Sequence, residues 1–124
     1  MRYMIIVKAS AASEAGTWPE AALQARLASY HEDLARAGVL LDAHALQPSA
    51  AGWRLRHRGG QAALADGPFD DAASLIAGYT LIQVRSRDEA LEWARRFPAP
   101  MGEFEDGEIE LRPLVEPERP AAHP

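Results

Sequence analysis

The chain has 124 residues, of which 48% are apolar and 25% charged, a balance typical of one folded globular domain and unlike that of a disordered chain. The sequence contains no cysteine, which excludes disulfides, thiolate nucleophiles and cysteine-ligated zinc or iron–sulfur centres. A formal net charge of −5 argues against a general nucleic-acid scaffold.

The N-terminal apolar segment, Tyr3–Val7, is too short for the apolar core of a signal peptide. It is also far shorter than the roughly 20 residues that a membrane-spanning helix needs. Apolar residues at successive positions instead predict a central β-strand that is covered on both faces. We therefore expect a cytoplasmic protein that does not contact a membrane.

A helix is predicted after a loop of small residues, Ala9–Gly16. Thr17 is expected to cap the helix, which should continue to about Ala37. Gly38 follows, and glycine is the residue type that most often ends a helix. A second strand is then predicted over Val39–Leu46.

The next segment predicts a β-hairpin. Residues 53–58 alternate, with Trp, Leu and His on one face and three arginines on the other. Gly59–Gly60 is expected to form the turn, and residues 61–65 should return beside the first strand. A second turn over 66–69 leads into a short polar or helical stretch that ends at Leu75.

The C-terminal part of the chain predicts a strand, a helix and a last strand. The strand covers Tyr79–Val84, and Ser86 is placed to cap the helix that follows. Pro98 should end that helix. Ile109–Pro113 is the last predicted strand, and the proline-rich tail 117–124 is expected to be disordered.

The order of elements is therefore strand, helix, strand, hairpin, strand, helix, strand. This order predicts an α+β protein of the ferredoxin-like βαββαβ plan with a β-hairpin insertion, in which both helices lie on one face of an antiparallel sheet. The folded domain should span residues 1–116. Because the first strand is apolar on both faces, we expect a second subunit to cover the other face, as a homodimer.

Five sequence blocks, in order, resemble YCII-related proteins of the DGPF type. They are Tyr30–Leu41, the intact motif Asp66-Gly67-Pro68-Phe69, Ile76–Val84, Glu89–Ala94 and Glu108–Pro113. The resemblance covers residues 1–116, nearly the whole chain. It implies a ferredoxin-like subunit that pairs into a dimeric α/β barrel, with a cleft near the dimer interface.

For function, the resemblance leaves three alternatives. Most DGPF-type proteins have no established reaction, which leaves a small-molecule-binding homodimer. A few members of the wider group are lyase-like enzymes, including a dehydrochlorinase that acts on a chlorinated hydroxyquinol, and some DGPF proteins are companions of extracytoplasmic-function sigma factors. The enzyme-like branch uses a His–Asp pair, and alignment on Ala37-Gly38 places its helix histidine near Leu27 rather than at His31.

Three residues are candidate catalytic groups. Asp42 and His44 lie two apart on a predicted strand, so they share a face, and a carboxylate beside an imidazole can orient a general base. Leu40 and Leu46 should flank the pair on that face and half-bury it. The pair could equally form a polar sheet edge or an intersubunit hydrogen bond. Asp66 could hold its turn through Asx-type hydrogen bonds or offer its carboxylate to the cleft.

Five further residues are candidate ligand contacts, namely His31, Trp53, Arg54, His57 and Tyr79. Trp53 and Tyr79 could line a cleft or pack in a dimer interface. His57 would join the Asp–His pair only if the two strands pair in register. His31 borders the apolar stripe of its helix, where a purely structural hydrogen bond is the alternative. Arg54 could bind an anion or lie on a solvated face.

No nucleotide-binding or metal-binding spacing is present in the sequence, so neither a cofactor nor a metal is expected. If the protein is an enzyme, acid–base residues alone would then support a lyase or an isomerase. The expected partners are a second copy of the chain and a small aromatic or anionic molecule, with no nucleic acid and no membrane.

Overall fold

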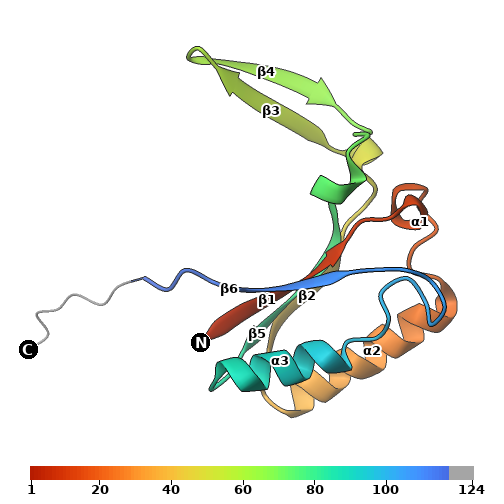
Figure 1. Ribbon diagram of the computed structural model, residues 1–124, viewed down its shortest axis with the longest axis vertical. Coiled ribbons are helices and arrows are strands. Elements are labelled where there is room, and N and C mark those ends of the chain that lie inside the picture. Colours follow the sequence, from red (N-terminus) through yellow and green to blue (C-terminus); the bar gives the residue numbers. More distant parts are fainter. Residues whose placement is uncertain (118–124) are drawn as a thin grey trace, which may run out of the picture.

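The structure, a computed structural model, describes residues 1–117 (Figure 1). Disorder is predicted for residues 117–124, and of these only Pro117 is described, so the prediction for residues 118–124 lies outside the described residues. The elements, in chain order, are β1 (Arg2–Lys8), α1 (Ala11–Glu14), α2 (Ala21–Arg36), β2 (Leu40–Ala45), the 3₁₀ turn η1 (Ser49–Ala51), β3 (Trp53–Arg58), β4 (Gln61–Asp66), the 3₁₀ turn η2 (Ala72–Ser74), β5 (Ile76–Gln83), α3 (Arg87–Arg96) and β6 (Ile109–Pro113).

Four of the strands form one antiparallel sheet in the order β2-β5-β1-β6, with β1 between β5 and β6. The strands β3 and β4 form a separate two-stranded sheet. Without the hairpin, the order is that of a ferredoxin-like α+β fold, as the sequence predicts. Within residues 1–117, no helix is both long and apolar enough to cross a membrane.

The core lies between the sheet and the helices α2 and α3, which cover the same face (Figure 1). On β1 the side chains of Tyr3, Ile5 and Val7 point into this core and are buried. Leu34 of α2 is also fully buried there. The other face of β1, which carries Met4, has no cover within the described chain. The first strand is thus apolar on both faces, as predicted, but the subunit covers only one of them.

The predicted start of the long helix is wrong in one detail. Thr17 does not cap α2, because its hydroxyl donates a hydrogen bond to the carbonyl of Ala12 at 3.0 Å. The segment expected to be a loop contains α1, which begins in a reciprocal capping box between Ser10 and Ser13. Glu20 stands at the N-cap of α2 with no side-chain cap bond.

The other helix ends follow the prediction. Gly38, with φ of 74°, directly follows the C-cap of α2, in the left-handed region that favours glycine. The hydroxyl of Ser86 accepts the backbone N–H of Glu89 at 3.1 Å and caps α3. The helix α3 ends at Arg96, and its C-cap Phe97 directly precedes Pro98.

A β-bulge in β2 changes which residues share a face. Leu40 lies opposite Ile82, whereas Asp42 lies opposite Leu81, so one extra residue separates the two positions. The extra residue reverses the alternation. Leu40 therefore packs against the core, and Asp42 lies on the uncovered face. The prediction that Leu40 flanks Asp42 on one face is wrong for this reason.

The β3–β4 hairpin leaves the domain at one end of the sheet and extends to the side opposite α2 and α3 (Figure 1). Its turn is Gly59–Gly60, with φ of 55° and 78°, as predicted. At its base, the N–H of Gly67 donates to the carbonyl of Gly52 at 2.9 Å, which holds the two ends of the hairpin together.

We predict that Gly67→Ala destabilises the base of the hairpin. A Cβ at this position would lie 1.8 Å from the carbonyl oxygen of Ser49, so the backbone has to shift. The expected loss of unfolding free energy is more than about 1 kcal/mol, measured by urea denaturation. Gly52→Ala is the matched control, because its Cβ would make an ordinary contact of 3.6 Å with the same oxygen. Equal stability of the two variants would contradict the prediction.

Candidate functional site

The uncovered face of the sheet, hereafter the open face, carries the candidate catalytic pair. The strand register aligns polar side chains of β2 with apolar side chains of β5 and β1. The two cross-strand rows are Asp42–Leu81–Met4 and His44–Tyr79–Ile6. The open face is therefore apolar at its centre and carries the acid–base groups at the β2 edge.

The side chains of Asp42, His44 and Tyr79 form one cluster of contacting polar groups, hereafter the acid–base cluster. The Tyr79 hydroxyl donates to Asp42 Oδ2 at 2.9 Å, and His44 Nε2 lies 3.0 Å from Asp42 Oδ1. The backbone N–H of Ala43 also donates to Asp42 Oδ1, at 3.0 Å. The predicted pairing of Asp42 with His44 is thus present, and Tyr79 joins it.

The hydrogen bonds determine the protonation of the cluster. The bond from Tyr79, aided by the Ala43 amide and by His44, holds the pKa of Asp42 below its ordinary value. An ionised carboxylate only accepts hydrogen bonds, so His44 donates from Nε2. The neutral imidazole then carries its free lone pair on Nδ1. The same bond to Asp42 raises the pKa of Tyr79 above its ordinary value.

The cluster is more exposed than the sequence predicts. The side chains of Asp42 and His44 are 47% and 66% exposed, respectively. Half-burial was expected from Leu40 and Leu46, but the bulge turns Leu40 toward the core. In a single chain, the His44 ring is therefore free to meet a molecule from outside.

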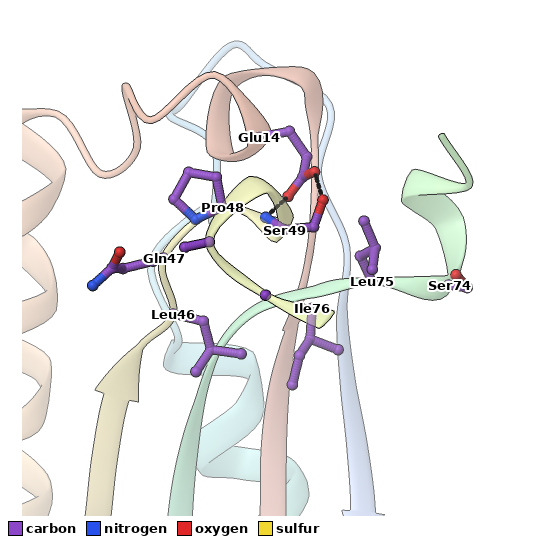
Figure 2. Close-up of a pocket in the computed structure, with 10 residues that line it drawn as sticks. Glu14, Leu46, Gln47, Pro48, Ser49, Ser74, Leu75 and Ile76 are labelled. Atoms are coloured by element: carbon purple, nitrogen blue, oxygen red, sulfur yellow. Dashed lines mark hydrogen bonds between the residues drawn. The ribbon is translucent and has the colours of Figure 1, made fainter. Parts of the chain in front are cut away.

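A pocket of about 680 Å³ lies at the hairpin end of the sheet (Figure 2). Leu46, Leu75 and Ile76 supply its apolar wall, and Glu14 and Ser49 supply polar groups. Figure 2 shows Leu46 and Ile76 on the same side of the strands, with Glu14 and Ser49 bonded to each other at the end of the pocket. Leu46 comes two residues after His44, so the pocket continues the edge that carries the cluster.

Glu14 and Ser49 were not recognised from the sequence. The Ser49 backbone N–H donates to Glu14 Oε1 at 2.9 Å, and its hydroxyl donates to Glu14 Oε2. These bonds lower the pKa of Glu14. The Ser49 hydroxyl also accepts the N–H of Phe69 at 3.0 Å. The two partners lie 35 positions apart with no motif between them, so no local pattern links them.

The structure places three predicted site residues, Trp53, His57 and Asp66, on the hairpin rather than at the acid–base cluster. The strand of His57 pairs with β4, while the strand of His44 pairs with β5. The condition under which His57 would join His44 is therefore not met within one chain. Trp53 and Asp66 face each other at the hairpin base, and both are exposed.

Arg54 is occupied by groups of its own chain. Its guanidinium bonds both carboxylate oxygens of Asp71, at 3.1 and 3.2 Å, and lies 4.0 Å from the centre of the Phe69 ring. Bonds from Ser74 and then Arg54 lower the pKa of Asp71 to about 2. These contacts connect the hairpin to the segment that follows it, which favours a structural role for Arg54 over anion binding.

His31 lies on the helix side of the sheet. Its Nε2 is 2.8 Å from the hydroxyl of the buried Thr80, which connects α2 to β5. Burial lowers the pKa of His31. The sheet separates this residue from the open face, so it does not belong to the acid–base cluster. Among residues 1–117, no three His, Asp or Glu side chains gather in a group that could hold a metal ion.

The fold and the site together define a ferredoxin-like α+β protein with an acid–base cluster on an uncovered sheet face. The pattern of the YCII-related domain matches residues 1–116, and the chain belongs to the YCII-related family, as the sequence blocks indicate. The chain is also 34% identical over 89 residues to an uncharacterized protein of Rhizobium meliloti (strain 1021). That match covers 72% of this chain and 70% of the relative.

We predict that His31→Gln flattens the pH dependence of stability. Because burial lowers the native pKa of His31, the unfolded chain takes up its proton at a higher pH than the native protein does. Wild-type stability should thus fall as the pH drops below about 6.5 and stop falling at the lowered native pKa. Urea denaturation from about pH 8 to pH 5, at one protein concentration, measures this difference. His57→Gln is the control, and an unchanged slope in His31→Gln would contradict the prediction.

We predict that Asp42→Asn lowers the pKa of Tyr79 toward its ordinary value, because the acceptor loses its negative charge. Tyrosine labelled with ¹³C at Cζ allows each hydroxyl to be titrated separately by NMR. Tyr30 is an internal reference, since burial raises its pKa independently of Asp42. Asp33→Asn, on the exposed side of α2, is the matched control. A Tyr79 titration that is the same in both variants would disprove the role of Asp42.

Proposed function

We propose that the protein is a homodimer that binds a small hydroxylated aromatic molecule on the open face, near the dimer interface. The observation that carries the proposal is the acid–base cluster of Tyr79, Asp42 and His44 at the edge of an uncovered sheet face that is apolar at its centre. Such a combination of apolar surface with a few convergent polar groups is typical of small-molecule sites.

The composition of the open face supports a second copy as its cover. An antiparallel sheet that meets water on one face usually carries polar residues there. Here the central strands present Met4, Ile6 and Leu81, which are half-buried although no helix covers them. A two-fold dimer can cover the same face of both subunits at once. It would also narrow the space beside Asp42 and His44 into a cleft.

The hydrogen-bonding pattern supports a ligand with a hydroxyl group. His44 Nδ1 has no partner in the cluster and is its free nitrogen acceptor, beside the remaining lone pairs of Asp42 Oδ2 and of the Tyr79 hydroxyl oxygen. A phenolic hydroxyl can donate to this nitrogen while its ring rests on the open face, where Tyr79 and Ile6 continue the row of His44. The negative charge of Asp42 disfavours an anion unless His44 is protonated.

The same geometry supports a second candidate, cofactor-independent proton transfer in a lyase or isomerase. His44 Nδ1 could accept a proton from a substrate carbon, and the ionised Asp42 at 3.0 Å would stabilise the resulting imidazolium. In this reading His44 is the base and Asp42 orients it. In an isomerase the proton would return from His44 to another carbon of the product. In a lyase the electron pair of the broken C–H bond would expel the leaving group, which would leave with the proton of His44.

The experiment compares thermal unfolding of wild type, His44→Ala and Glu32→Ala with phenol or with toluene, which lacks the hydroxyl. Phenol should raise the melting temperature of wild type and of Glu32→Ala more than toluene does, and this difference should disappear in His44→Ala. Glu32 is an exposed residue of α2 and serves as the control. Equal responses of His44→Ala and wild type would contradict binding at the cluster.

Two further measurements on the same proteins separate the alternatives. Sedimentation velocity should show a dimer. A protein that stays monomeric at every concentration would contradict the homodimer. The open face would then be accessible to a different protein, as the function of a regulatory companion of a sigma factor requires. Incubation of phenylacetone, an uncharged aryl ketone, in D₂O reveals proton transfer as loss of the signal of its CH₂ protons in NMR spectra. Exchange that wild type accelerates and His44→Ala does not would establish the enzyme reading over simple binding.

A further inference from the structure

We propose that the β3–β4 hairpin is an arm that docks on the second copy of the chain through the face that carries Trp53, Leu55 and Leu64. The inference rests on the proposed function only for the existence of a dimer. It adds a second contact region, separate from the open face, and assigns that region to named residues.

The docking face of the arm is apolar and exposed. Trp53, Leu55 and Leu64 are 66%, 62% and 64% exposed, respectively. Leu55 and Leu64 are direct cross-strand partners, and Trp53 lies on the same side as Leu55, two residues earlier. An isolated two-stranded hairpin is marginally stable in water, so a hairpin of this kind gains from a partner surface. Exposed apolar patches of this kind mark interaction sites.

The contacts of the hairpin with its own domain involve its other face. Arg54 points toward Asp71 and Phe69 of the same chain. Neighbouring residues on a strand point to opposite faces, so Trp53 and Leu55 point away from these contacts. The apolar face is thus directed away from the segment to which the hairpin is tied, and another chain can reach it.

The position of the arm favours a second copy as the occupant. The hairpin extends to the side of the sheet opposite α2 and α3, the side on which the open face lies (Figure 1). A second subunit packed on the open face must occupy the space beside the arm. Two-fold symmetry would then give each subunit the arm of the other.

Charge complementarity supports the same occupant. Residues 53–66 contain three arginines and one aspartate, a net charge of +2, while the whole chain carries −5. The rest of the chain therefore carries −7. Five acidic residues and no basic residue lie within positions 103–110 alone. The arginines lie on the face of the arm opposite Trp53 and Leu55, so this charge acts at long range: it attracts the arm of one copy to the acidic body of another before the apolar face makes contact.

Sedimentation equilibrium of Leu64→Lys and of Ala63→Lys tests the proposal. The two variants add the same charge to neighbouring positions of β4, but Leu64 lies on the docking face and Ala63 on the opposite face. Leu64→Lys should raise the dimer dissociation constant by about tenfold or more, as loss of a central apolar contact does. Ala63→Lys should change it by less than about threefold.

A wild-type measurement keeps the test independent of the folding of the variants. Hydrogen exchange of the β3 and β4 amides should slow when the protein concentration is raised from below to above the dissociation constant. Equal dimer dissociation constants of Leu64→Lys and Ala63→Lys, with hydrogen exchange of the hairpin amides independent of protein concentration, would contradict docking by the arm. They would not contradict the dimer. A wild-type chain that stays monomeric would overturn the dimer itself and the arm with it.

Discussion

Both long helices lie on the same side of the four-stranded sheet, yet the central strands β1 and β5 present apolar residues on both faces, with polar residues at the β2 and β6 edges of the open face. The subunit therefore has more apolar sheet surface than its helices cover, and this is the constraint on which the rest of the molecule depends. Met4 and Ile6 of β1, with Leu81 and Tyr79 of β5, need cover that the subunit does not supply. An apolar face left open in this way suits a partner surface or a ligand site, and the arrangement supports both uses at once.

The acid–base cluster depends on this face in turn. A single residue, Asp42, accepts a hydrogen bond from a tyrosine of the neighbouring strand and lies 3.0 Å from a histidine of its own strand. These contacts hold the pKa of the carboxyl below its ordinary value. The bulge before Asp42 is what brings the carboxylate to the open side, so a local irregularity of β2 sets up the chemistry of the site.

The sequence predicted the parts of this arrangement that depend on short-range periodicity. Asp42 and His44 share a face because they are two apart on a strand, and the helix ends at Gly38 and Ser86 follow from local chemistry. The bond from Tyr79 depends on the register between β2 and β5, which local patterns do not specify. The sequence places Leu40 on the wrong face of the sheet because no residue type in this segment indicates a β-bulge. The Glu14–Ser49 bond depends on tertiary structure alone.

The closed base of the hairpin has a consequence for how this family can diversify. Because the backbones of Gly52 and Gly67 are hydrogen-bonded to each other, the insertion leaves and rejoins the domain at nearly the same point. The tip of the hairpin can therefore be lengthened or shortened without changing the strand order of the four-stranded sheet.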